Sequence, residues 1–326
     1  MPVPAPGAVG LAVGLAVDTV LADPRRGHPV AVFGGVAARL EQSVHRDSRP
    51  PGVAYALALV GGAAALGLPV ARTPPSTRAA LTALVTWAVV GGTTLRREAA
   101  AMDALLGADD LAGARRRVSH LCGRDPAQLD VEGLARATVE SVAENTADAV
   151  VGPLVWGALL GVPGLLGYRA VNTLDAMVGH RSPRHARFGW ASARADDAAN
   201  LLPARLTAAL VVVLAPVVGG GPRAALRAWW RDGGKHPSPN AGPVEAAFAG
   251  ALGRTLGGRL AYAGRVEDRP LLGDGPAPRV DDVARAARLS LAVQLAAGVL
   301  AVGVRALVER RGLLVERRGL LVGRRA

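Results

Sequence analysis

The stretch 53–71 reads VAYALALVGGAAALGLPVA and contains no charged residue. A helix that crosses a hydrocarbon layer of about 30 Å needs roughly 17–25 predominantly apolar residues, so this stretch predicts a membrane span. Comparable uncharged runs occur at 79–95, 149–168, 206–222 and 289–304, and a sixth run at 3–22 is interrupted only by Asp18. The sequence therefore predicts an all-α, polytopic integral membrane protein. It has four to six apolar segments, which are joined by polar helical loops.

The overall composition supports this fold class. Of the 326 residues, 50% are hydrophobic but only 3% are aromatic, and the mean hydropathy is +0.27. A soluble domain rarely combines positive mean hydropathy with so few aromatic residues. The apolar residues are mainly Ala, Leu, Val and Gly, which allow transmembrane helices to pack closely. The single cysteine, Cys122, excludes an internal disulfide framework.

The chain is strongly basic, with a net charge of +12, and Lys235 is its only lysine. Such a charge also suits nucleic-acid binding. However, the arginines flank the apolar segments, so we expect a lipid bilayer and no nucleic acid as partner. The first positive charges, Arg25 and Arg26, follow the first apolar run, which lacks the basic start of a secretory signal. We expect a multi-pass protein of the cell membrane whose active site faces the cytoplasm.

Two apolar runs contain helix breakers. The run 149–168 includes Pro153, Gly161 and Pro163, and strict alternation of spans would place its flanking polar motifs on opposite sides of the bilayer. A re-entrant or interfacial hairpin resolves this conflict. The run 206–222, which contains Pro216, is a candidate partial span.

The C-terminal region carries a short tandem repeat. Residues 309–322 repeat a seven-residue unit twice, which is too short to sustain a coiled coil. We therefore treat 1–308 as one membrane domain and 309–326 as a basic, repetitive tail without chemistry.

Asparagine marks the polar clusters. The four asparagines are Asn145, Asn172, Asn200 and Asn240, and each lies beside an apolar segment or a Pro/Gly turn. A chain that otherwise avoids Asn and Lys is expected to keep them where an amide or ammonium group is needed. The alternative is that turns simply favour Asn.

Three carboxylates form the first cluster. Glu140, Glu144 and Asp148 are spaced i, i+4, i+8 and would stack along one face of an α-helix. Like charges at this spacing repel, so Mg²⁺ or arginines should compensate them. A solvated acidic face is the alternative, although it is costly beside an apolar segment.

The middle of the chain carries two further clusters. Asn172 and Asp175 are i, i+3 neighbours that suit a shared ligand or a helix cap. Arg194, with Asp196 and Asp197, suits a phosphate and its Mg²⁺, because guanidinium binds oxyanions and carboxylates bind Mg²⁺. Internal ion pairs are the alternative.

A polar loop at 230–242 contains Lys235, His236, Ser238 and Asn240 between glycines and prolines. It does not match the spacing of a Walker phosphate loop. Lys235 and His236 are nevertheless candidates for oxyanion contact or proton transfer. Asp18, an ionisable residue inside an apolar run, is also a functional candidate, or else an interfacial partner of Arg25 or Arg26.

Taken together, these clusters resemble the CobD/CbiB family of cobalamin-biosynthesis membrane proteins. The resemblance covers roughly residues 10–305, and the string Lys235–Gly242 is its most specific part. The chain departs from the family pattern at Ala149, where a glycine is usual, and at His180, where an aromatic residue is usual. The remaining matching segments are Asp18 to Val30, Val139 to Asp148, Val171 to Gly179, Phe188 to Arg205, and Glu245.

The resemblance implies synthesis of adenosylcobinamide or its phosphate. In this reaction aminopropanol, or its O-phosphate, is joined by an amide bond to the free propionate of (adenosyl)cobyric acid. A carboxylate is a poor acyl donor, so ATP and Mg²⁺ are expected as well. Two other classes stay open: a membrane transporter, which would use broken helices and Asp18, and a non-catalytic scaffold for corrinoids. The sequence does not indicate whether a partner subunit is required.

Residue type suggests individual roles. We expect Mg²⁺ on Glu144, Asp148 and Asp196 or Asp197, and we expect Lys235 and Arg194 to contact phosphate oxygens. Glu140 or His236 would accept the amine proton. The expected substrate-binding residues are Asp18, Asn145, Asn172, Asp175, Arg194, Asn200, Ser238 and Asn240.

Overall fold

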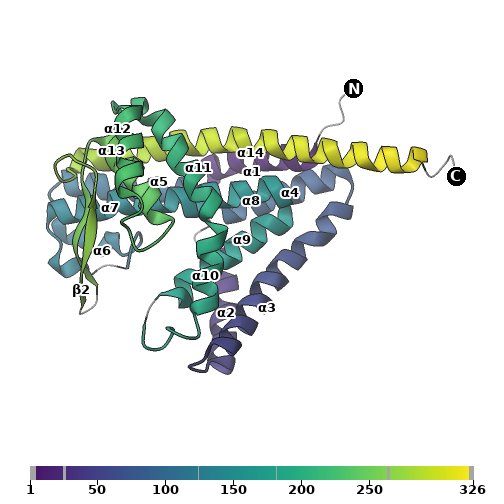
Figure 1. Ribbon diagram of the computed structural model, residues 1–326, viewed down its shortest axis with the longest axis horizontal. Coiled ribbons are helices and arrows are strands. Elements are labelled where there is room, and N and C mark those ends of the chain that lie inside the picture. Colours follow the sequence, from purple (N-terminus) through teal and green to yellow (C-terminus); the bar gives the residue numbers. More distant parts are fainter. Residues whose placement is uncertain (1–4, 25–26, 124, 181, 263–264, 323–326) are drawn as a thin grey trace. The chain divides into compact units, whose positions relative to one another are not determined.

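The computed structural model describes residues 5–24, 27–123, 125–180, 182–262 and 265–322. Their regular secondary structure is helical apart from one two-stranded hairpin (Figure 1). The predicted helical, polytopic class is confirmed, and the hairpin is an addition to it. Arg25 and Arg26, the first positive charges after the first apolar run, lie outside the described residues.

The chain divides into two compact units, each built from separated stretches. The first unit comprises Met1–Val90, Pro153–Asp196 and Ala297–Ala326. The second comprises Gly91–Gly152 and Asp197–Ala296. Three helices, α8 (Gly152–Leu160), α10 (Trp190–Ala199) and α14 (Val280–Val322), contribute residues to both units.

In the first unit, α1 (Pro6–Leu21) packs along α4 (Pro75–Val89) through small residues. A Cβ atom added to Gly10 or Gly14 would lie 2.5 Å from the Cβ of Thr82 or Thr86, respectively. This close approach of two backbones is typical of helices that associate within membranes.

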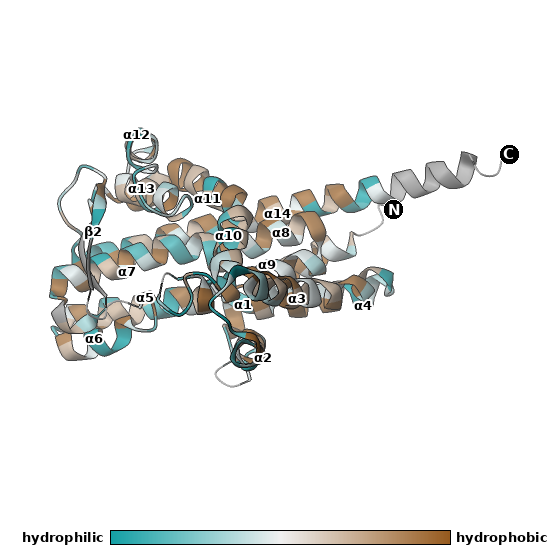
Figure 2. Ribbon diagram, turned by 60° about the horizontal axis from the view of Figure 1, so that its bottom comes forward, coloured by the Kyte–Doolittle hydropathy of each residue, from teal (hydrophilic) through white to brown (hydrophobic). Residues whose placement is uncertain are grey.

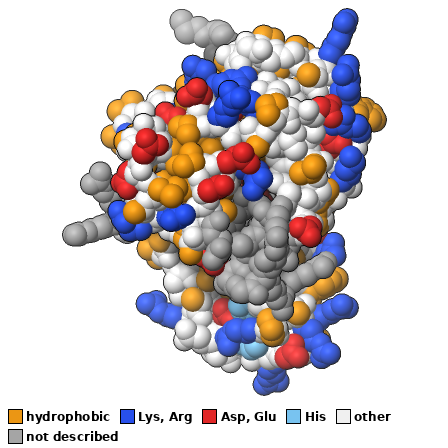
Figure 3. All heavy atoms as spheres, turned by 90° about the vertical axis from the view of Figure 1, so that its left-hand side faces the viewer, with side chains coloured by type: hydrophobic (Ala, Val, Ile, Leu, Met, Phe, Trp, Pro, Cys, Tyr) orange, Lys and Arg blue, Asp and Glu red, His pale blue; other side chains and the backbone are white. Residues whose placement is uncertain are grey.

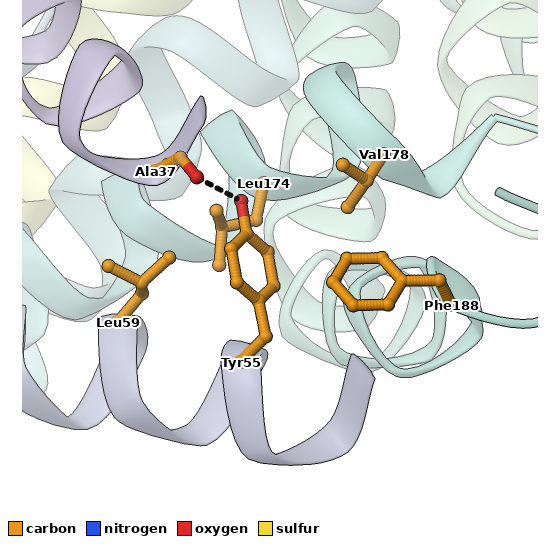
Figure 4. Close-up of a cluster of buried hydrophobic side chains, with 6 residues drawn as sticks. All are labelled: Ala37, Tyr55, Leu59, Leu174, Val178 and Phe188. Carbon is orange, nitrogen blue, oxygen red and sulfur yellow. Dashed lines mark hydrogen bonds between the residues drawn. The ribbon is translucent and has the colours of Figure 1, made fainter. Parts of the chain in front are cut away.

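A second contact joins α2 (Pro29–Val44), α3 (Arg49–Gly67) and α9 (Val162–Leu174). Figure 4 shows the buried cluster at their meeting point, in which the Tyr55 hydroxyl donates to the Ala37 carbonyl oxygen at 3.2 Å. A short 3-10 helix, η1 (Leu68–Arg72), extends α3. The cluster consists of Ala37, Tyr55, Leu59, Leu174, Val178 and Phe188.

The apolar run 149–168 is broken into two helices. α8 (Gly152–Leu160) and α9 have 9 and 13 residues, each too short to span a bilayer, which takes about 17–25. They separate at Gly161, whose φ of +69° favours glycine. Gly164 of α9 packs so closely on α8 that an added Cβ would lie 2.1 Å from the Trp156 carbonyl oxygen. The predicted interruption is therefore present, as a tight helical hairpin.

The second unit surrounds α13 (Ala241–Leu252), which is almost entirely buried. α13 packs against α7 (Val131–Asn145), α11 (Leu201–Leu214) and α12 (Pro222–Asp232). It also packs against the antiparallel hairpin of β1 (Leu256–Tyr262) and β2 (Arg265–Leu272). The bounds of the other elements are α5 (Gly92–Gly107), α6 (Leu111–Val118), η2 (Pro126–Gln128) and η5 (Ala215–Val218).

Four of the described helical stretches are long and apolar enough to cross a membrane: Arg49–Arg72, Pro75–Gly107, Leu201–Val218 and Val280–Gly312. α1 is apolar but shorter. The predicted run 206–222 thus lies mostly within a helix of sufficient length. In Figure 2 the brown colour that marks hydrophobic residues is found along these segments. Leu66 and Val299 on them are 77% and 75% exposed, as expected of side chains that face lipid.

α14 continues to Val322 without a break, past the predicted start of the tail at residue 309. Glu309 accepts hydrogen bonds from the Gly7 amide at 3.0 and 3.2 Å and pairs with Arg305 at 3.1 Å. The first residue of the repeat therefore caps the N-terminus of α1. Residues 323–326 lie outside the described part of the chain.

Candidate functional site

The loop between α12 and α13 is organised by a buried carboxylate. The side chain of Asp232 is 1% exposed and accepts hydrogen bonds from Lys235 Nζ at 2.8 Å and from the Gly273 amide at 2.9 Å. Arg231 Nε donates to the same carboxylate at 2.8 Å. The hydrogen bond from Arg231 lowers the pKa of Asp232 well below its usual value; burial opposes this shift, and Lys235 and Gly273 reinforce it. Asp232 therefore stays ionised and holds Lys235 in place.

His236 is held neutral beside a cation. Its Nε2 lies 2.6 Å from Arg269 Nη1, and its Nδ1 lies 3.0 Å from the Ser238 amide nitrogen. Burial and, to a smaller extent, the charge of Arg269 lower the pKa of His236 to about 4, and the hydrogen bond with the backbone of Ser238 opposes the shift. A neutral imidazole has one lone pair for hydrogen bonding, so it can accept from only one of these two donors at a time.

Ser238 and Asn240 shape the start of α13. The Ser238 hydroxyl accepts from the amides of Asn240 at 3.3 Å and Ala241 at 3.2 Å. The Asn240 side chain is buried; its Nδ2 donates to the Asp197 carbonyl oxygen at 2.8 Å, and its Oδ1 accepts from Arg205 Nη1 at 2.7 Å. Asn240 thus orients Arg205, a residue outside the predicted site.

A cavity of about 470 Å³ lies beside this loop, entirely within the second unit. None of its described lining residues is an Asp or Glu. The signal that could have found Arg205 is that it is the only charged residue in the apolar helix 201–218. The cavity is lined by Arg205, Trp229, Trp230, Gly233, Gly234, His236, Pro237, Pro239 and Pro243.

The predicted carboxylate stack on α7 is altered by the local helix geometry. Glu140 is buried, and its Oε1 accepts from the Gly257 amide at 2.6 Å, which ties α7 to β1. Glu144 is exposed, and Asp148 is half-buried. The α-helix ends at Asn145 and a π-helix, η3 (Thr146–Val151), follows, so the α-helical i+8 register that we predicted does not extend to Asp148. The wider i→i+5 turn is the physical reason.

A second π-helix, η4 (Asp175–Gly179), begins at another predicted site residue. Asn172 lies just before this π-helix, and its Oδ1 accepts a hydrogen bond from Arg169 Nη1 at 3.4 Å. π-Turns are rare and often occur at functional sites. Both of them fall within clusters that the sequence marked by Asn and Asp, although the sequence did not predict the π geometry.

The predicted residues do not all belong to one unit. Lys235, His236, Ser238 and Asn240 lie together in the loop, and Asn240 also contacts the backbone of Asp197. Asp18, which is fully buried in α1, belongs to the first unit. The first unit also contains Asn172, Asp175, Arg194 and Asp196, and the second also contains Glu140, Glu144, Asn145, Asp148, Asp197 and Asn200.

The charged side chains that the structure describes do not by themselves form a complete metal-binding site. Within the described ranges no three His, Cys, Asp or Glu residues are grouped so that they could hold a metal ion. Mg²⁺ commonly uses only one or two protein carboxylates together with substrate phosphates and water. Glu144 and Asp148, which both reach solvent, fit that mode, and Mg²⁺ binding stays a prediction. Acidic and basic side chains are interspersed on the face shown in Figure 3.

A family model described as CobD/Cbib protein matches residues 11–290, which include the loop, the cavity and both π-helices. The chain belongs to the CobD/CbiB family. Three similar relatives are each called Cobalamin biosynthesis protein CobD. The relative from Mycobacterium tuberculosis is 57% identical over 296 residues, covering 90% of this chain and 95% of the relative.

The other two CobD/CbiB relatives are more distant. The one from Rhodobacter capsulatus is 43% identical over 286 residues, covering 84% of this chain and 90% of the relative. The one from Chromobacterium violaceum is 40% identical over 319 residues, covering 92% and 99%. No solved structure matches this CobD/CbiB chain.

Proposed function

We propose that this CobD/CbiB protein acts in cobalamin biosynthesis as an ATP-dependent amide ligase. It would join aminopropanol, or aminopropanol phosphate, to the free propionate of (adenosyl)cobyric acid. The observation that carries the proposal is the loop in which Asp232 fixes Lys235 beside a cavity lined by His236. Membership of the family supports the pathway.

The chemistry requires activation of a carboxylate. A propionate oxygen attacks the γ-phosphorus of ATP, ADP leaves, and an acyl phosphate forms. The amine nitrogen then attacks the carbonyl carbon, the carbon–oxygen bond to phosphate breaks, and inorganic phosphate leaves. One proton must be removed from the amine. Phosphoryl transfer is catalysed mostly by positioning and charge neutralisation, so a fixed cation is the main requirement.

Lys235 is suited to that requirement. Its side chain is 50% exposed, although its ammonium group is bonded to Asp232, so it can reach a phosphate without losing its anchor. Mg²⁺, when bound at Glu144 and Asp148, would neutralise further phosphate charge. Arg194 is exposed and is proposed to contact phosphate oxygens as well. Asn145 and Asn172 are proposed to orient amides of the corrin.

Of the two candidate bases, His236 is better placed than Glu140. His236 lines the cavity and is neutral at pH 7, whereas Glu140 is buried and bonded to the Gly257 amide. The His236 Nε2 contacts Arg269, so accepting a proton there requires that contact to open. Glu140 is then a positioning residue for β1.

Mass spectrometry of the corrinoid tests the proposal. The purified protein, in nanodiscs, is incubated with adenosylcobyric acid, aminopropanol phosphate and Mg·ATP, and in parallel with aminopropanol. We expect an ATP-dependent mass gain that corresponds to one amide-linked amine. No gain with either amine, from protein shown to be folded, would overturn the ligase. Energised uptake of corrinoid into vesicles would instead support a transporter.

A further inference from the structure

Arg205 is a charged residue in an otherwise apolar helix. It lies in the first turns of α11, within the segment Leu201–Val218 that is long and apolar enough to span a membrane. A charge at such a position is costly and typically has a function. Its Nη1 donates to the neutral Asn240 side chain, and none of the described carboxylates forms an ion pair with it. By contrast, Arg117, Arg184, Arg231, Arg254, Arg285 and Arg305 each pair with a carboxylate.

The geometry leaves the binding edge of this guanidinium available. Asn240 is fixed by its bond to the Asp197 carbonyl oxygen and uses only Nη1 of Arg205. The Nε and Nη2 groups form the parallel pair of donors that binds an oxyanion in bidentate fashion. Asn240 therefore orients the cation without neutralising it.

The surrounding cavity favours an anion with a flat or apolar body. Arg205 is the charged residue among the described lining residues. The other ionisable one, His236, has a pKa of about 4 and is therefore neutral at pH 7. Trp229, Trp230 and three prolines form the remaining large walls. A volume of about 470 Å³ exceeds what a phosphate group alone needs. Apolar walls with a few placed polar groups are typical of small-molecule sites.

We propose that Arg205 binds the phosphate group of a phosphorylated substrate in this cavity. The phosphate can come from the phosphorylated amine or from the nucleotide, and both present the same oxyanion to the guanidinium. The choice of the phosphorylated amine and the nucleotide as the two sources of the phosphate rests on the proposed ligase function. Asn240 is a positioning residue, and the Asp197 carbonyl oxygen fixes it.

Binding calorimetry on the full chain in nanodiscs tests this site. The probes are aminopropanol phosphate, ATP and unphosphorylated aminopropanol, and the variants are Arg205→Gln, Arg205→Lys and Asn240→Asp. One of the two phosphorylated probes is expected to use the site. We expect Arg205→Gln to lower the affinity for that probe by about tenfold or more, because charge-assisted hydrogen bonds are lost. Arg205→Lys should bind with intermediate affinity, because it keeps the charge but loses the fork. Asn240→Asp should weaken binding by neutralising Arg205.

Arg227→Gln is the matched control, because Arg227 is an exposed arginine on α12 that does not line the cavity. It should bind all probes like the wild type. Equal phosphate affinity in Arg205→Gln and wild type would overturn the site, as would failure of the wild type to bind either phosphorylated probe. If Arg205→Gln does not fold, the phosphate affinities of Arg205→Lys and Asn240→Asp are compared with that of the wild type instead, and equal affinities would overturn the site.

Amide formation is measured on the same preparations, which separates the two proposals. Ligation without Arg205-dependent phosphate binding would refute the site and keep the ligase. Arg205-dependent phosphate binding without ligation would keep the site and refute the ligase.

Discussion

At the scale of single residues, Asp232 decides how the polar loop is held. One buried carboxylate joins α12, the following loop and the end of β2 through Arg231, Lys235 and the Gly273 amide. Hydrogen bonds to a charged group contribute about 1.5–3 kcal/mol each when they are well formed. Lys235 is the more exposed of the two cations, at 50% against 41% for Arg231, so its ammonium group can serve a ligand while Asp232 keeps its other partners.

Replacing Lys235 with Met should therefore remove activity and spare the fold. We expect amide formation to fall by about 100-fold or more, the usual effect of losing a positioned donor at developing charge. Loss of the bond from Lys235 to the buried Asp232 should lower stability by about 1.5–3 kcal/mol, while Arg231 and the Gly273 amide still hold the carboxylate. Product formation by mass spectrometry and thermal unfolding in detergent measure the two effects, with Arg227→Gln as control. An active Lys235→Met variant would remove Lys235 from the mechanism.

The pKa of His236 should depend on its cationic neighbour. Burial and the positive charge of Arg269 both disfavour the imidazolium, so the wild type should titrate near pH 4. Arg269→Gln removes the repelling charge and should move the midpoint upward, while burial, the larger cause, keeps the pKa below its usual value. NMR of protein carrying ¹³C-labelled histidine measures the midpoint without requiring turnover. An unchanged midpoint in Arg269→Gln would show that the guanidinium is not beside the imidazole in solution.

At the scale of elements, the hairpin of α8 and α9 depends on residues without side chains. Gly164 allows α9 to approach the carbonyl of Trp156, and Gly161 adopts a φ of +69° at the turn. Two short helices that pack this closely can bury the backbone at the break, as an apolar environment requires.

Gly164→Ala should destabilise this hairpin. The added methyl group would lie 2.1 Å from the Trp156 carbonyl oxygen, and overpacking of this kind costs about 1–3 kcal/mol. Gly61→Ala in α3 is the control, because an added Cβ there meets nothing within 4 Å. It should be neutral or stabilising, since alanine is the better helix former. Thermal unfolding in detergent compares them, and equal stability of Gly164→Ala and wild type would contradict the close contact.

At the scale of the whole molecule, the four long apolar helices agree with a multi-pass membrane protein. The polar segment 223–288 carries many of the arginines, and arginine-rich loops are retained in the cytoplasm. We therefore expect the loop with Lys235 to face the cytoplasm, where ATP is present.

Cysteine labelling tests this orientation. Pro276, an exposed residue between β2 and α14, is replaced by Cys in a Cys122→Ser background. A membrane-impermeant maleimide should label Pro276→Cys in inside-out vesicles and leave it unlabelled in intact cells. The Cys122→Ser parent is the control for background labelling. Labelling in intact cells would place the loop outside and would contradict access to cytoplasmic ATP.

Much of the fold could be predicted because it depends on local composition. The uncharged runs at 53–71, 206–222 and 289–304 each lie mostly within one continuous helix, and the breakers in 149–168 lie where the helix breaks. The hairpin of β1 and β2 was missed because its strands lack clean apolar–polar alternation. The continuation of α14 past residue 309 was missed because a repeat was interpreted as a tail.

The candidate site could be predicted only in part. Lys235, His236, Ser238 and Asn240 are neighbours in the chain, so their association in one loop followed from the sequence. Arg205 was missed because its link to Asn240 joins segments far apart in sequence. The burial of Glu140 against the Gly257 amide and the π-helix that contains Asp148 were missed for a related reason, since both depend on packing partners.

The sequence by itself determined that this chain is a helical membrane protein with a polar loop at 230–242, because span length and turn chemistry are set by residues close in the chain. Only the tertiary structure decided which charges are neutralised. Lys235 and Arg231 form ion pairs with Asp232, whereas Arg205 is hydrogen-bonded to the neutral amide of Asn240 beside the cavity, so its charge is not neutralised there. The strength of an electrostatic interaction depends on distance and burial, which are properties of the packed molecule.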